Sequence, residues 1–224
     1  MTSLNWFVSI QLNQLNNLIC MTSVNIDLYQ LLKEEIGNGS PNLVTRETGR
    51  IIRERIEREL KKAEVIYLDF SKIGIIDYSC ADEIIARLVS RLVGSEYGER
   101  FIVLTNLNPN QEENIHVALE KKKLALLKQT ATEGLTPRKG SRRLQPAKER
   151  ELEIIGFIAN HLREVFEMVN ERGRLTAKEL ADKLKLELNT AATRLLNLYK
   201  KYLVTRTEET SSEGGRQFVY GRVE

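Results

Sequence analysis

The spacing of apolar residues switches along the first 130 residues between a helical and a strand-like period. The segment 45–63 is rich in charge but keeps its apolar residues on one stripe, which predicts an amphipathic helix. The stripe consists of Ile51, Ile52, Ile56 and Leu60.

Two short apolar runs follow, VIYLDF at residues 65–70 and FIVLTN at residues 101–106. Both are too short and too apolar for a surface helix, so each predicts a buried strand, the first of them central in its sheet. A further strand is expected near residues 24–28.

Helical spacing returns in residues 79–93 and again in residues 108–127, where Asn108 is the expected N-cap and Pro109 the first helical position. Helices of this length between strands give right-handed crossovers. The first part of the chain is therefore predicted to be an α/β domain with a parallel or mixed sheet covered by helices.

The second half of the chain has the apolar spacing of three successive helices. Residues 151–172 keep apolar residues at helical spacing and predict one long helix. A capping box, Thr176 with Glu179, opens a short helix that reaches Leu184. Asn189 is expected to cap a third helix that runs to about residue 202.

The chain ends in two β-rich runs, LVTRTEET and RQFVYGRV, around the turn SSEGG, which predicts a hairpin. Three helices and a terminal hairpin make an α+β winged helix-turn-helix. The residues ELADKLKLELNTAATRLLNLYKKYLVTR resemble the helix-turn-helix core of winged-helix transcription regulators.

Charge is distributed unevenly over the 224 residues, whose net charge is +3. The segment 137–150, PRKGSRRLQPAKER, carries six Lys and Arg against one Glu and has the composition of a solvated linker. We therefore expect an appendage at 1–22, an α/β domain at 23–136 and a winged-helix domain at 151–224. The basic linker suits either a DNA-contacting arm or a plain spacer.

The first twenty residues lack the basic start and uninterrupted apolar centre of a secretory signal, and Met21 is an alternative initiator. No apolar run approaches the roughly 20 residues that span a bilayer. Cys20 and Cys80 are the two cysteines and form no disulfide framework. A cytoplasmic protein without membrane association is expected.

The order LDFSKIGIIDYSCADEI, preceded by LVTRETGR and followed by FIVLTNLN, resembles the STAS-like family, which is related to the anti-sigma-factor antagonists of bacterial partner-switching systems. In those antagonists, a kinase phosphorylates a serine at the start of the helix after the strand. The resemblance implies Ser79 as that position, with Asp77 beside it. Tyr78 and Cys80 stand where the family commonly has small residues.

The residues around Ser79 also admit a purely structural interpretation. Ser79 is followed three residues later by Asp82, which is close to a capping box, so the hydroxyl could simply satisfy a backbone amide of the helix. A phosphate would place about two negative charges at the positive helix end. Both interpretations stay open.

The third helix of the second domain is expected to bury Ala192, Leu195, Leu196, Tyr199 and Leu203. An outward face without acidic residues then remains, and its side chains suit base edges and phosphates in a major groove. The candidate DNA-binding residues are Thr190, Thr193, Arg194, Asn197, Lys200 and Lys201, with Arg206 and Arg216 flanking the wing.

We expect a transcriptional regulator that binds double-stranded DNA, forms a homodimer and receives a signal or a protein partner at its STAS-like domain. No enzyme activity, cofactor or metal site is expected, because Cys80 and His116 are not placed together by any motif and a Gly-rich phosphate loop is absent from the sequence. The alternative is a partner-switching protein that binds a kinase-like ATPase and uses the winged helix for protein contact.

Overall fold

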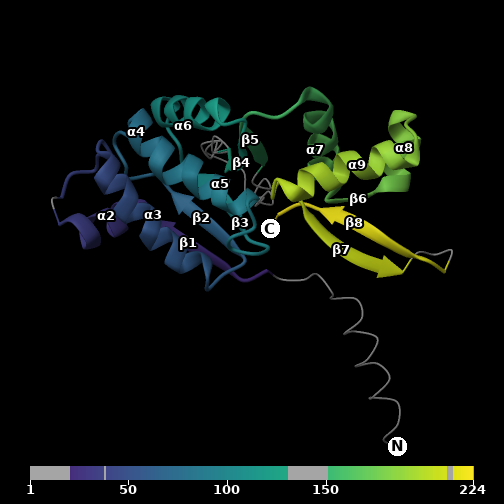
Figure 1. Cartoon of the computed structure of the whole chain (residues 1–224), viewed down its shortest axis with the longest axis horizontal. Helices are drawn as coiled ribbons and strands as arrows, with labels where there is room; N and C mark the ends of the chain where they lie inside the picture. The colour runs from purple at the N-terminus through teal and green to yellow at the C-terminus, as the bar shows by residue number, and fades with distance from the viewer. Residues whose placement is uncertain (1–20, 38, 131–150, 211–213, 224) are drawn as a thin grey trace, which may run out of the picture.

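The computed structural model describes residues 21–37, 39–130, 151–210 and 214–223. The predicted basic linker and most of the predicted N-terminal appendage lie outside these residues. Figure 1 shows an α/β unit followed by a smaller unit of helices and a hairpin. None of the described helices combines the length and the apolar character needed to cross a membrane.

The first unit contains β1 (Ser23–Asp27), α2 (Leu28–Ile36), α3 (Arg46–Leu60), β2 (Val65–Asp69), α4 (Tyr78–Ala81), the π-helical stretch η1 (Asp82–Ala86), α5 (Arg87–Val93), β3 (Phe101–Thr105), α6 (Pro109–Lys121), β4 (Ala125–Gln129) and β5 (Leu152–Gly156). The second unit contains α7 (Asn160–Arg172), β6 (Arg174–Thr176), α8 (Ala177–Leu184), α9 (Leu188–Lys200), β7 (Thr205–Thr210) and β8 (Arg216–Gly221).

The first unit is built on a five-stranded sheet in the order β1-β2-β3-β4-β5. Strands β1 to β4 are parallel, and β5 runs antiparallel to β4. Because the parallel strands follow one another in chain order, right-handed crossovers put their helices on one face of the sheet, as the ribbon in Figure 1 shows. All five residues of β3 are buried, which confirms the strands expected from the apolar runs.

The structure confirms the starts of two predicted helices, and each has a capping side chain. Helix α3 begins after Thr45, and α6 begins after Asn108, which forms a capping box with Gln111 and is followed by Pro109 at the first helical position. The helix expected at residues 79–93 is a continuous helical path that includes the π-helical stretch η1.

Two predicted helices are wrong in part, because a portion of each forms a strand. Helix α6 stops at Lys121 rather than residue 127; Lys123 adopts a φ of 54°, and β4 follows. Residues 152–156, expected to start the long helix, form β5 instead. Apolar runs of this length fit a buried strand as well as a helix stripe.

Gly156 ends β5 with a φ of 94°. A Cβ atom at this position would lie 2.4 Å from the carbonyl oxygen of Leu124 and 2.8 Å from Cβ of Leu119. The backbone of β5 therefore passes β4 and α6 too closely for any side chain. The sheet of the first unit thus includes residues beyond the expected domain boundary.

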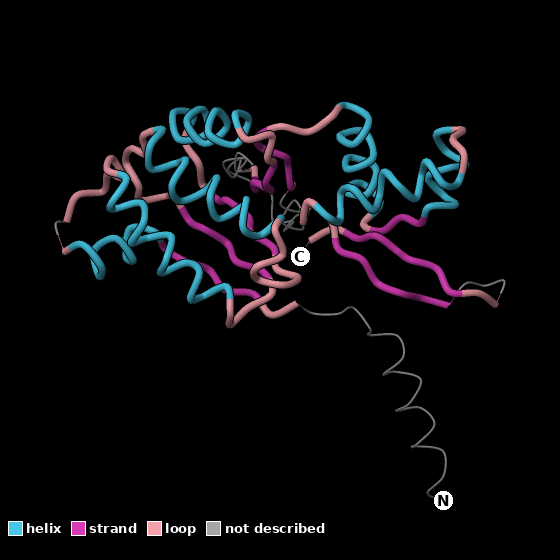
Figure 2. Tube along the Cα trace, viewed as in Figure 1, coloured by secondary structure: helices cyan, strands magenta, loops and turns pink. Residues whose placement is uncertain are grey.

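The second unit packs three helices against a three-stranded antiparallel sheet in the order β6-β8-β7 (Figure 2). The capping box of Thr176 and Glu179 and the terminal hairpin are confirmed. Strand β6 was not expected. Asn189 is not a cap, because α9 begins at Leu188 after Glu187, without a capping side chain.

The two units are in direct contact. The ring of Phe101 on β3 lies edge-on to the ring of Tyr202, which follows α9, with 6.2 Å between the ring centroids. The buried apolar residues of both units form one continuous cluster. The end of α9 is therefore packed directly against the sheet of the first unit.

Candidate nucleic-acid interface and Ser79 site

The outward face of α9 lines a shallow depression of about 490 Å³. Four of the eight candidate DNA-binding residues lie together there: Thr190, Thr193, Arg194 and Asn197. Asn189 and His161 complete the lining. The Thr193 hydroxyl donates a hydrogen bond to the carbonyl oxygen of Asn189 at 2.7 Å, which fixes its rotamer on this face.

His161 lies at the start of α7 and is exposed, and the sequence analysis did not identify it. Nothing in the spacing of residues links it to α9, because their proximity depends on how α7 crosses that helix. It adds a further polar side chain to the depression.

The expected burial of α9 is correct in part. Leu195 and Leu203 are buried, whereas Ala192, Leu196 and Tyr199 are only partly buried. The residues that complete the buried face are Ala191 and Leu198.

The four other candidates lie apart from the depression lining. Lys200 ends α9 and is exposed, and Lys201 caps it. The guanidinium of Arg206 is held between two rings, with its central carbon 4.3 Å from the Tyr199 ring centroid and 4.4 Å from that of Phe218. Stacking of this kind restricts the side chain without neutralising its charge.

Carboxylates of the hairpin pair with an arginine on the hairpin and with one on β6. Arg216 is exposed and pairs with Glu208 at 3.4 Å, and Arg174 pairs with Glu209 at 2.8 Å. Such exposed pairs contribute little to stability, but each one reduces the local positive charge. The hairpin is thus less basic than its arginines alone indicate.

The helix that starts near Ser79 is capped by Asp77. An oxygen of the Asp77 carboxylate accepts a hydrogen bond from the backbone N–H of Cys80 at 2.7 Å, and the Ser79 hydroxyl donates to the same carboxylate at 2.9 Å. The expectation that Ser79 caps this helix is therefore wrong. The helix begins at Tyr78, one residue earlier than expected, and Asp is among the preferred N-caps.

Two exposed apolar side chains lie on segments next to Asp77. Val44 is 49% and Ile75 is 55% exposed, and their segments are joined by a short parallel bridge between Leu43 and Ile76. The backbone N–H of Asp77 donates to the carbonyl oxygen of Leu43 at 3.0 Å. Ser79, which is half-buried, therefore follows a turn that carries exposed apolar surface.

A buried ion network anchors the helix that begins at this turn. Glu83 on η1 is 1% exposed and lies within 3.5 Å of three guanidinium groups, those of Arg46, Arg53 and Arg87. Several partners are needed to offset the cost of removing a carboxylate from water. Short π-helical stretches such as η1 are frequent at functional sites.

Cys80 and His116 hold separate structural positions. Burial, with the nearby Asp77 carboxylate, raises the pKa of the Cys80 thiol to about 12, and the thiol donates to the carbonyl oxygen of Thr45 at 2.9 Å. His116 accepts a hydrogen bond from the backbone N–H of Gly156 at 3.3 Å. Within the described residues, no three His, Cys, Asp or Glu side chains form a group that could hold a metal.

A family model described as a STAS-like domain of unknown function matches residues 48–112. The match runs from the first turn of α3 into the first turn of α6. The mixed α/β fold with its mostly parallel sheet is consistent with such a domain. Neither the curated proteins nor the solved structures contain a match to this chain.

Proposed function

We propose that this protein is a DNA-binding transcriptional regulator, with a winged helix-turn-helix domain at its C-terminal end and a non-catalytic STAS-like domain that receives a signal or a protein partner. The observation that carries the proposal is the face of α9. It brings Arg194, Asn197, Thr190 and Thr193 together around one depression that contains no acidic residue.

The arrangement of elements supports the winged-helix assignment. Helices α8 and α9 are joined by a short turn in which Lys185 adopts a left-handed conformation, as in a helix-turn-helix unit. The β7–β8 hairpin follows α9 directly and corresponds to the wing. In such a unit the second helix enters the major groove.

The side chains on α9 match the chemistry of a DNA groove. Arginine can bond bidentately to guanine, asparagine to adenine, and threonine can contact thymine methyl groups or phosphates. The proposed phosphate contacts are Lys200, Lys201, Arg206 and Arg216. A homodimer in the cytoplasm is part of the proposal, because two copies can engage half-sites one helical turn apart.

Fluorescence anisotropy with a labelled duplex from just upstream of the gene tests the proposal, at two salt concentrations. Four phosphate contacts predict a loss of affinity of about 100-fold for a fourfold increase in salt. Arg194→Ala should weaken binding by about tenfold to 100-fold, the value of one bidentate base contact.

Arg58→Ala is the matched control, because it removes one exposed arginine from α3 in the first unit and leaves α9 intact. This variant should bind DNA like the wild type. Equal weakening by Arg58→Ala and Arg194→Ala would indicate a general charge effect and would contradict the assignment of α9. No binding at low salt would refute the function.

Partner switching is the second candidate function, in which the protein binds a kinase-like ATPase and the winged helix makes protein contacts. Two observations favour it: the exposed apolar residues Val44 and Ile75 near Ser79, and the hairpin glutamates that pair with Arg174 and Arg216. Binding to such a partner through apolar surface should change little with salt. Ser79→Asp should weaken it if phosphorylation controls the contact.

A further inference from the structure

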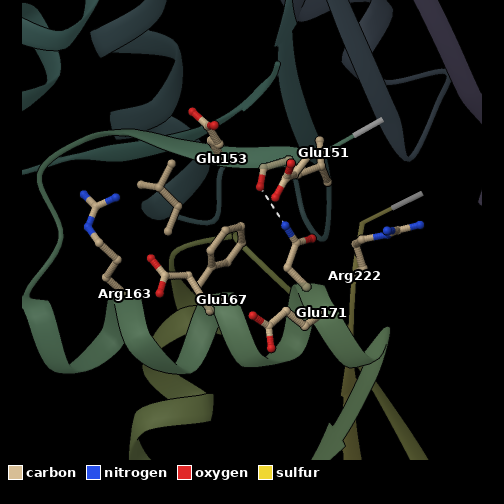
Figure 3. Close-up of a pocket in the computed structure, with 10 residues that line it drawn as sticks. Glu151, Glu153, Arg163, Glu167, Glu171 and Arg222 are labelled. Atoms are coloured by element: carbon tan, nitrogen blue, oxygen red, sulfur yellow. Dashed lines mark hydrogen bonds between the residues drawn. The ribbon is translucent and has the colours of Figure 1, made fainter. Parts of the chain in front are cut away.

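A cavity of about 530 Å³ separates the outer edge of β5 from α7, and Figure 3 shows the side chains that line it. The apolar residues Leu152, Ile154 and Phe166 form part of its wall, and each is at most 7% exposed. This cavity lies where the sheet of the first unit meets the first helix of the second. It is separate from the depression on α9 and from Ser79.

Four glutamates line the cavity in two rows. Glu151 precedes β5 and Glu153 lies on it, whereas Glu167 and Glu171 lie one turn apart on α7 (Figure 3). Within each row the residues are about 6 to 7 Å apart, as set by helix and strand geometry. Among these four in the described part of the chain, only Glu153 has an ion-pair partner, Lys128 at 3.1 Å.

Hydrogen-bonding groups without partners also face this side of β5. The Oδ1 atom of Asn170 is buried and accepts no hydrogen bond from the described residues. Glu151, just before β5, accepts a backbone hydrogen bond from Thr130, just after β4, at 3.0 Å. Residues 153 and 155 therefore bond to β4, and the alternate residue Ile154 directs its backbone N–H and carbonyl away from β4. The hydrogen-bonding groups of the cavity that have no partner among the described residues are therefore mostly acceptors, and a ligand with many hydrogen-bond donors would satisfy them.

The ends of the open strand edge are already occupied. The Asn170 amide donates to the carbonyl oxygen of Leu152 at 2.7 Å, and the backbone N–H of Gly156 donates to His116. An added peptide strand would have to displace both contacts. A compact ligand fits this edge better than an extended peptide.

Two arginines, Arg163 and Arg222, share the cavity lining with the four glutamates, so the lining has a net charge of −2. We propose that the cavity binds an aliphatic polyamine. Its ammonium groups would pair with the carboxylates of Glu151, Glu167 and Glu171 and donate to Asn170, and its methylene spacers would lie on the apolar wall. The Glu153 carboxylate is already paired with Lys128 and points away from α7 (Figure 3). This inference does not depend on DNA binding.

Isothermal titration calorimetry of the full chain with spermidine, at constant ionic strength and without DNA, tests the proposal. The wild type should give saturable binding. The double variant Glu167→Gln/Glu171→Gln should weaken it by about tenfold, because it removes two exposed charge contacts. Glu164→Gln is the matched control, since Glu164 is exposed on the same helix and does not line the cavity.

Binding by Glu164→Gln should equal that of the wild type, and circular dichroism should show that all variants are folded. The proposal is overturned if spermidine does not bind, or if Glu164→Gln and the double variant lose affinity equally. It is also overturned if magnesium chloride produces the same heat, or if a short lysine-rich peptide binds the cavity and spermidine does not.

Discussion

Replacing Gly156 with alanine should destabilise the protein by about 3 kcal/mol or more. The backbone conformation alone, with φ at 94°, costs a residue with a side chain about 1 to 3 kcal/mol. The new methyl group would then lie 2.4 Å from the carbonyl oxygen of Leu124, and overpacking of this kind adds about 1 to 3 kcal/mol. Typical domains are stable by only about 5 to 15 kcal/mol, so the loss is large.

Gly98→Ala separates the two contributions. Gly98 also has a positive φ, 72°, but a Cβ atom there would meet nothing within 4 Å. This variant should therefore lose only about 1 kcal/mol, from backbone conformation. Urea denaturation followed by circular dichroism measures both variants, and the difference between them gives the cost of the contact with Leu124.

The sign of the change in the free energy of unfolding caused by Gly156→Ala shows whether residues 152–156 form a strand or part of a helix. If residues 151–172 formed one long helix, alanine would stabilise the protein by about 1 kcal/mol, since glycine is a poor helix former. A stabilised or unchanged Gly156→Ala variant would refute the placement of β5 beside β4.

Three further predictions concern the Ser79 turn, the thiol and the second unit. Asp77→Ala should lower the free energy of unfolding by about 1 kcal/mol in urea denaturation, because it removes the cap of the helix, and Ser79→Ala should cost less. In a Cys20→Ser background, the Cys80 thiol should not react with a disulfide reagent at pH 8 until the protein unfolds, because burial raises its pKa to about 12. Rapid labelling of the folded protein would contradict the burial of this thiol. Hydrogen bonds from the backbone and the hydroxyl of Thr176 lower the pKa of Glu179. This contact therefore stabilises the protein at neutral pH and is lost as the pH falls through the lowered pKa. Thr176→Val removes the hydroxyl and should show a shallower loss of stability in acid than the wild type.

Local signals account for the parts of the fold that the sequence predicted well. The strands at residues 65–70 and 101–106 are short, continuous apolar runs between helices, and the capping boxes at Asn108 and Thr176 define helix starts within a few residues. Each of these signals is complete within about ten residues of chain. None requires knowledge of a distant neighbour.

The pairing of β4 with β5 could not be predicted in this way. The two strands are separated by residues 130–151, and their apolar runs fit a helix stripe equally well. The cavity beside β5 depends on that pairing and on the crossing of α7, so it was also missed. For the same reason His161 was missed, whereas Arg194 and Asn197 followed from the periodicity of a single helix.

Helix α7 contributes residues to both proposed sites. Its 13 residues span about 20 Å, with His161 beside the depression on α9 at one end and Glu171 at the cavity near the other. If a polyamine changes the position of α7, its affinity for the arrangement of α7 that binds DNA must differ from its affinity for the arrangement that does not. Linkage then requires DNA to change the polyamine affinity by the same factor as the polyamine changes the DNA affinity. Measuring both factors therefore tests coupling through α7 separately from the existence of either site, because two functional but uncoupled sites would give factors of one.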